Sequence, residues 1–255
     1  MKIGIVQMQM NWTVAQNLMT ISEHIESLVT LDILIFPELA LSGFHRNIKT
    51  ESKMDLIQSA VTELCHLAKK HKTTLFFGAP TVVGSHVFNS YLCISNTGRV
   101  VAQWDKTGLT ESESSFFSKG GNREVLTING VRCSAIICRE VEDIDWFISQ
   151  TRSSRPGLII WPSYISQSGD ERSSTGYFSA VSDIANKLGA FVLQCNWPHA
   201  LNDQSISGLG GSRILGRDGK CIFTMPMDQV AVSILEFSEG SLQLVKPLSS
   251  VEAVL

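Results

Sequence analysis

The sequence predicts an α/β fold because strand-like and helix-like segments alternate along it. Residues 2–8 form an apolar, strand-like segment, and apolar side chains then recur at helical spacing over 14–28. A second, buried strand is expected over 31–36, followed by an amphipathic helix over 56–67 and a strand over 74–78. This alternation is typical of helices that pack on a sheet.

Two β-hairpins are expected farther along the chain. The β-rich stretch 87–105 is divided by the turn signal Asn96-Thr97-Gly98. Asn129-Gly130 can join a strand over 123–128 to one over 131–138 in the same way, because Asn-Gly favours a tight two-residue turn.

The second half of the sequence also contains a late helix and a glycine-rich turn. Apolar spacing predicts a helix over 178–188, which Gly189 ends before strand character resumes over 190–196. The segment 208–212 is rich in glycine but lacks the strand-to-helix setting and the following lysine of a phosphate-binding loop. We interpret it as a tight turn that enters a strand.

The composition favours one compact domain spanning residues 1–255. Hydrophobic residues make up 44% of the sequence and charged residues 18%, which is unlike a disordered chain. The net charge is −3, and the basic cluster Lys69-Lys70-His71-Lys72 falls at an expected helix end, so nucleic acid is not an expected partner. No apolar run approaches the roughly 20 residues of a membrane span, and no signal segment follows Met1-Lys2. We therefore expect a cytoplasmic protein with no membrane partner.

The six cysteines show no metal-binding pattern. They contain no Cys-x-x-Cys pair, and no Cys/His spacing is of the zinc type. Most are expected to be buried, inert thiols in a reducing compartment, with Cys138 as the exception. Neither a metal nor another cofactor is expected.

Three reactive side chains, Glu38, Lys106 and Cys138, each follow a short strand-like run. A carboxylate can take the proton of a thiol, a thiolate can attack a carbonyl carbon, and an ammonium can stabilise the negative charge that then develops on oxygen. A free thiol is only a few per cent ionised at neutral pH, so Cys138 needs a neighbouring base. The three residue types together predict acyl-transfer chemistry.

The segments around these residues resemble motifs of the nitrilase superfamily of carbon-nitrogen hydrolases. In order, the matching segments are 36–44, 104–109 and 135–140, with further likeness at 2–7, 88–90, 158–162 and 211–212. The resemblance covers nearly the whole chain. It implies a four-layer α-β-β-α sandwich that commonly pairs with a second copy, so a homodimer is expected.

The resemblance also implies a role for each residue of the set. Glu38 would be the general base and Cys138 the nucleophile, while Lys106 and the backbone N–H of Arg139 would stabilise the tetrahedral intermediate. Many family members carry a second glutamate that orients the lysine or the substrate. Glu113 matches that position, and the nearby Glu111 competes for the role.

Two further residues are candidate contacts to the substrate, Arg139 and Tyr164. Arg139 directly follows the nucleophile, where the family often has an aromatic residue. A guanidinium pairs well with a carboxylate, so Arg139 suggests a substrate that bears one, such as an ω-amide or an N-carbamoyl acid. The alternative is that Arg139 pairs with a neighbouring acid: Glu140, Glu142 or Asp143.

The predicted activity is hydrolysis of a C–N bond in a small amide or N-carbamoyl compound through a thioester on Cys138, with release of ammonia or an amine. Nitriles are possible for this chemistry, but amides and ureides are commoner in the family. Two alternatives stay open, namely acyl transfer to an amine by the same residues and a catalytically silent binding protein.

Overall fold

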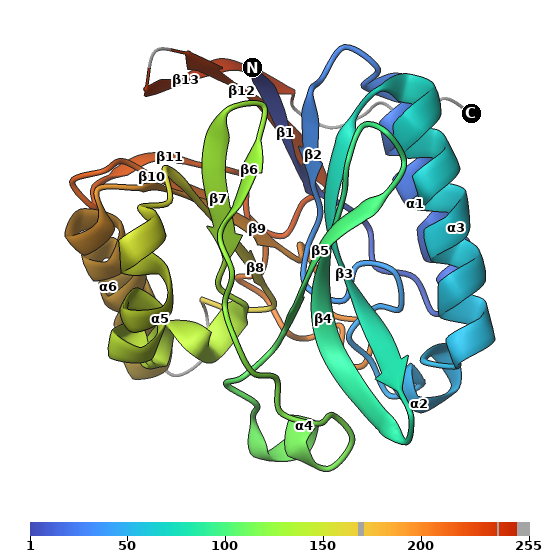
Figure 1. The fold of residues 1–255 in the computed structure, drawn as a ribbon. Helices are drawn as coiled ribbons and strands as arrows, with labels where there is room; N and C mark the ends of the chain where they lie inside the picture. The colour runs from blue at the N-terminus through green and yellow to red at the C-terminus, as the bar shows by residue number, and fades with distance from the viewer. Residues whose placement is uncertain (168–170, 239, 249–255) are drawn as a thin grey trace.

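The computed structural model describes residues 1–167, 171–238 and 240–248, which form two β-sheets that face each other (Figure 1). In the first sheet the strands run in the order β13-β12-β1-β2-β3-β4-β5. Their bounds are β1 Lys2–Gln7, β2 Ile33–Ile35, β3 Thr74–Val83, β4 His86–Ile94, β5 Val100–Asp105, β12 Ala231–Ser238 and β13 Ser241–Leu248.

The second sheet has the order β11-β10-β9-β8-β7-β6. Its strands are β6 Leu126–Ile128, β7 Val131–Ala135, β8 Leu158–Ser163, β9 Phe191–Asn196, β10 Arg213–Leu215 and β11 Cys221–Thr224. The central pairs β1-β2-β3 and β7-β8-β9 are parallel, and the outer pairs are antiparallel.

Helices cover the outer face of each sheet. The helices are α1 Val14–Ser27, α2 Ile48–Glu51, α3 Met54–His71, α4 Glu111–Ser114, α5 Ile144–Thr151 and α6 Glu171–Leu188, with short 3₁₀ turns η1 Cys138–Glu142 and η2 Arg152–Ser154. In Figure 1, α1 and α3 lie outside the first sheet and α5 and α6 outside the second. The expected four-layer α-β-β-α sandwich is therefore confirmed.

Three apolar cores separate these layers. One lies between the first sheet and its helices and includes Ile25 and Leu64; a second lies between the sheets and includes Ile5 and Leu193. The third packs β8 and β9 against α5 and α6. No helix in the described part of the chain is long and apolar enough to cross a membrane.

The turn chemistry expected from the sequence is present. Asn129 and Gly130 have φ values of 47° and 80°, the left-handed pair that a tight hairpin turn needs, and they join β6 to β7. The strand expected over 74–78 was too short, since β3 continues through Pro80 to Val83. Proline is tolerated there because β2 pairs only with Thr74–Phe76, which leaves the rest of β3 with one partner strand.

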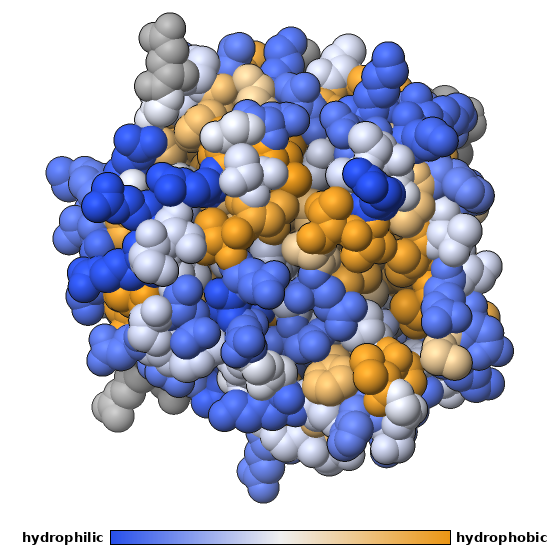
Figure 2. All heavy atoms as spheres, in the orientation of Figure 1, coloured by the Kyte–Doolittle hydropathy of each residue, from blue (hydrophilic) through white to orange (hydrophobic). Residues whose placement is uncertain are grey.

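One hollow of about 420 Å³ lies between α3 and the β3-β4-β5 edge of the first sheet. Apolar side chains line much of it, and Figure 2 shows an apolar area among hydrophilic side chains on the face drawn there. The exposed members include Met54, Val83 and Val100. None of the candidate site residues lines this hollow.

Candidate active site

Glu38 is held by a loop that lies directly on a neighbouring strand. The loop follows β2 and places Leu39 at a φ of 50°, in the left-handed region. A Cβ at Gly78 would lie 1.9 Å from the backbone nitrogen of Leu39, so only glycine allows this approach. Gly78 also donates to the Pro37 carbonyl at 3.1 Å, and the Trp197 indole donates to the Glu38 carbonyl at 2.7 Å.

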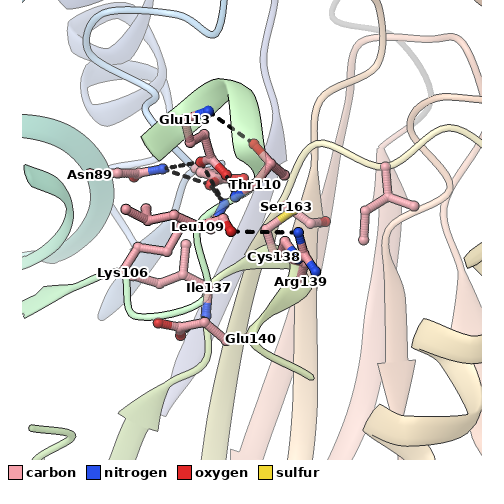
Figure 3. Close-up of polar contacts among 12 residues, drawn as sticks. Asn89, Lys106, Leu109, Thr110, Glu113, Ile137, Cys138, Arg139, Glu140 and Ser163 are labelled. Atoms are coloured by element: carbon pink, nitrogen blue, oxygen red, sulfur yellow. Dashed lines mark hydrogen bonds and ion pairs between the residues drawn. The ribbon is translucent and has the colours of Figure 1, made fainter. Parts of the chain in front are cut away.

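Lys106 lies at the end of β5 with its ammonium enclosed by two carboxylates. Its Nζ donates to Oε1 of Glu38 and to Oε1 of Glu113, each at 2.7 Å, and all three side chains are at most 2% exposed. Asn89 on β4 donates to the same two oxygens at 2.8 and 3.1 Å. Figure 3 shows Asn89, Lys106 and Glu113 pointing toward one another.

Glu113, rather than Glu111, is the second carboxylate beside the lysine. Its other oxygen accepts from the backbone N–H of Thr110 at 2.8 Å, while its own N–H donates to the Thr110 hydroxyl at 3.1 Å. This reciprocal capping box fixes the start of α4 and aims Glu113 at Lys106. Glu111 is exposed.

The two glutamates differ in their acidity. Burial raises the pKa of Glu38 above its usual range, although the ammonium of Lys106 opposes this rise. Burial acts on Glu113 in the same direction, but the charge of Lys106 and the bonds from Thr110 outweigh it, so the pKa of Glu113 is lowered. Burial alone would lower the pKa of Lys106; the neighbouring negative groups reverse this effect and raise it, so the amine stays protonated.

Glu38 also has an oxygen that can take part in proton transfer. Its Oε2 is buried and has no hydrogen-bond partner among the residues that the structure describes. Because Oε1 is occupied by Lys106 and Asn89, Oε2 is the atom that can accept and return a proton.

Cys138 begins the 3₁₀ turn after β7 in a left-handed conformation, with a φ of 50°. Non-glycine residues in this region are strained and are held there by their surroundings. The carbonyl of Cys138 accepts from the Trp161 indole at 2.9 Å. Burial, followed by the charge of Glu38, raises the pKa of the thiol, while Lys106 and a backbone hydrogen bond from Tyr164 oppose this rise. The residue remains partly exposed.

The other five cysteines lie outside this cluster. Cys93, Cys133 and Cys195 are buried, as the sequence suggested for most of them. Cys65 is half-buried, and Cys221, on the edge strand β11, is exposed. Cys221 is therefore not one of the buried thiols that the sequence suggested.

Arg139 follows Cys138 in the chain and the backbone of Tyr164 bonds to the Cys138 sulfur, but the two side chains have different surroundings. The Arg139 guanidinium bonds to Glu142 at 2.9 and 2.5 Å and reaches the Leu109 carbonyl at 3.5 Å. This is the neighbouring-acid pairing that the sequence left open. Tyr164 stacks on Phe44 with ring centroids 5.2 Å apart. Phe44 in turn lines a hollow of about 220 Å³ that Glu113 and Phe117 also line.

Sequence reasoning gave no role to three buried polar side chains around this cluster. Asn89 lies in a segment, 88–90, that contributed to the family resemblance, and that was the available signal. Glu140 was noted only as an acid after the nucleophile, and its buried ion pair with Arg123 had no local signal.

Comparisons with known proteins place the chain in a family. The family model described as carbon-nitrogen hydrolase matches residues 2–246. A 2-oxoglutaramate amidase from Bacillus subtilis (strain 168) is 26% identical over 137 residues, which are 51% of this chain and 53% of that protein. An (R)-stereoselective amidase from Pseudomonas sp is 24% identical over 200 residues, 78% of this chain and 70% of that protein.

Solved structures show the same fold. An amidase from Nesterenkonia sp. superposes with a TM-score of 0.79 and 20% identity, covering 92% of this chain and 89% of that one. A variant of the amidase from Nesterenkonia sp. AN1, with the acetamide moiety of fluoroacetamide added covalently at its active site cysteine, gives a TM-score of 0.80 at 19% identity, over 92% and 89%. This chain belongs to the carbon-nitrogen hydrolase family.

Proposed function

We propose that this protein hydrolyses a small amide through a thioester on Cys138, with Glu38, Lys106 and Glu113 as the other catalytic residues. The observation that carries the proposal is the buried Oε2 of Glu38, which has no hydrogen-bond partner among the described residues, beside an ammonium that two carboxylates hold. The amidase relatives support an amide as the substrate class.

In the first half-reaction, Glu38 takes the proton of the Cys138 thiol and the sulfur attacks the amide carbon. The C=O bond opens, and the oxygen becomes an oxyanion beside the Lys106 ammonium and the backbone N–H of Arg139. That N–H is available because the first N–H groups of a helical turn have no acceptor within it. The C=O bond then re-forms as the C–N bond breaks, Glu38 gives its proton to the leaving nitrogen, and ammonia or an amine departs from the thioester.

In the second half-reaction, water attacks the carbon of the thioester. Glu38 accepts a proton from the water, the oxyanion forms again at the same place, and the C–S bond breaks. The proton returns from Glu38 to the sulfur, which regenerates the thiol and releases a carboxylic acid. Glu38 therefore exchanges protons in both halves, which suits its raised pKa.

Glu113 has the opposite task in this proposal. Because its pKa is lowered, it stays ionised and holds the Lys106 ammonium in place through the cycle. Two carboxyl groups whose surroundings push their pKa values apart commonly divide the work in this way. Asn89 supports both by donating to each.

The hollow of about 220 Å³ beside Glu113 suits a small substrate. Tyr164 is proposed to contact the acyl group, because its backbone bonds to the Cys138 sulfur and its ring stacks on Phe44 at that hollow. Recognition of a substrate carboxylate by Arg139 stays a proposal, and it requires that the carboxylate displace or join Glu142. We also propose a cytoplasmic homodimer; sedimentation velocity of the purified chain and imaging of a tagged chain test the two parts.

The test is ammonia release over a panel of small amides, ω-amides and N-carbamoyl acids, using native protein, Cys138→Ala and Glu38→Gln. Cys221→Ala is the matched control, because this thiol is exposed and lies outside the cluster. We expect turnover by native protein and by the control, and none by the two site variants. Repeating the assay with hydroxylamine distinguishes hydrolysis from acyl transfer, since transfer would yield mainly the hydroxamate. Equal turnover by Cys138→Ala and native protein would overturn the proposal.

A further inference from the structure

A single carboxylate, that of Glu140, connects the segment that carries Cys138 to the segment that carries Lys106. One oxygen accepts from the backbone N–H of Ile137, the residue before the nucleophile, at 2.6 Å. The other oxygen accepts from the backbone N–H and the hydroxyl of Thr107, the residue after the lysine, at 2.6 and 3.0 Å. Figure 3 shows Glu140 beside Ile137.

The charge of this carboxylate is balanced by Arg123. Nη2 of Arg123 donates to the same Glu140 oxygen that Thr107 uses, at 2.5 Å, and both charged side chains are fully buried. The Arg123 guanidinium also lies over the ring of Trp146, 5.5 Å from its centroid. Burying two charges costs free energy even when they are paired. A buried ion pair is therefore a costly way to do nothing more than hold two loops together.

The two joined segments are also in close contact. A Cβ at Gly108 would lie 3.2 Å from the Cα of Glu140, so the backbone after Lys106 rests on the 3₁₀ turn. Cys138 at the start of that turn has the strained φ of 50°, which persists only when its neighbours are held. The bond from Ile137 to Glu140 holds the residue next to it.

We propose that Glu140 and Arg123, the Glu140–Arg123 clamp, are positioning residues that set the place of the Cys138 sulfur relative to the Lys106 ammonium. The inference rests on the function proposed above for those two residues. The clamp touches no substrate: it acts through Ile137 on the nucleophile and through Thr107 on the lysine.

The test substitutes Glu140→Gln and measures kcat, KM and the pH dependence of Cys138 alkylation by iodoacetamide. The amide NH₂ would face the N–H donors of Ile137 or Thr107, so the clamp loosens. A displacement of about 1 Å in an active site costs about 100-fold in rate, and we expect kcat to fall by about this factor while KM changes by less than about threefold.

The alkylation profile separates positioning from a change in charge. Removing a carboxylate without moving anything would favour the thiolate and shift the profile to lower pH. If the clamp fails, Lys106 stabilises the thiolate less, and the profile shifts to higher pH. An upward shift supports the proposal; a downward shift or an unchanged profile overturns it.

A matched control addresses loss of stability. Ile25→Ala removes a fully buried side chain from the core between the first sheet and its helices, and the described members of that core include no residue of either joined segment. If Glu140→Gln lowers kcat no more than Ile25→Ala at a similar loss of Tm, the clamp is only structural and the proposal fails. If Glu140→Gln does not fold, Thr107→Val is used instead, because it removes one hydroxyl hydrogen bond to the clamp. We expect a smaller change of the same sign in kcat and in the pH profile of alkylation. The absence of that change would overturn the proposal.

Alkylation also separates this proposal from the proposed function, because it requires no turnover. Suppose that native protein hydrolyses no amide, but that the pH profile of Cys138 alkylation shifts upward in Glu140→Gln. That result would contradict the proposed function and support the positioning role of the clamp. If native protein hydrolyses an amide and Glu140→Gln has the same kcat, the proposed function is supported and the clamp proposal is overturned.

Discussion

Replacing Lys106 with methionine should destabilise the protein in a way that depends on pH. The substitution leaves the oxygens of Glu38 and Glu113, each 2.7 Å from the lost ammonium, buried and unneutralised. Removing one partner of a buried ion pair costs about 3–5 kcal/mol. We expect a loss of this size at about pH 8, where both carboxyl groups would otherwise be ionised.

The sign of the pH effect follows from the pKa of the two carboxyl groups in Lys106→Met. Burial and their mutual repulsion act without the opposing ammonium, so the pKa of at least one rises further above its ordinary value of 4.5. A carboxyl group that binds its proton more tightly in the folded protein favours folding at low pH. The variant should therefore be most stable below its unfolded pKa and lose stability as the pH rises through the folded one.

The assay is urea unfolding followed by tryptophan fluorescence at about pH 5.5 and about pH 8, with Lys106→Met/Glu113→Gln as the control. Trp104, Trp161 and Trp197 are buried and should report the transition. The control removes one carboxylate and should recover much of the stability at about pH 8, but not turnover, because the oxyanion still lacks its ammonium. An equal free energy of unfolding for native protein and Lys106→Met at both pH values, or turnover of Lys106→Met within about tenfold of native, would refute the reasoning.

Three further predictions concern reactivity, packing and specificity. Limiting iodoacetamide should label Cys138 before the more exposed Cys221, as read by peptide mass spectrometry, because only Cys138 has a base and an ammonium beside it; first labelling at Cys221 would contradict this. Gly78→Ala should lower turnover, and should lower the free energy of unfolding by at least about 3 kcal/mol, because its Cβ would collide with the loop that carries Glu38. Gly121→Ala has open space around it and should change neither by much, so similar effects of the two substitutions would contradict the packing argument. If Arg139 binds a substrate carboxylate, Glu142→Gln should raise kcat/KM for acidic amides relative to neutral ones by about tenfold and Arg139→Ala should lower that ratio, while no change in either variant returns Arg139 to a structural role.

The sequence indicated the positions of the central residues because each has a local signal. Glu38, Lys106 and Cys138 stand where strands end, and apolar runs mark those ends well. The ends of β2, β5 and β7 meet in space because the two sheets face each other, and that packing was expected only through the family resemblance.

The supporting residues could not be predicted in the same way, because they depend on strand register and on long-range packing. Asn89 reaches the two glutamates because antiparallel pairing places it next to the end of β5. There its backbone carbonyl accepts from the backbone N–H of Lys106. Arg123 and Glu140 are 17 residues apart and meet only after the β6–β7 hairpin has formed. A lone arginine or glutamate in a sequence is usually exposed, so their burial has no local signal.

The most direct measurement of the central claim is the mass of the enzyme during turnover. A good amide substrate is mixed with native protein, quenched rapidly in acid, and analysed by intact-mass and peptide mass spectrometry. We expect Cys138 to gain the mass of the substrate minus the released ammonia or amine, and we expect no such adduct on Cys138→Ala. Acid product formed at the native rate by Cys138→Ala, or an acyl adduct on another residue, would contradict it.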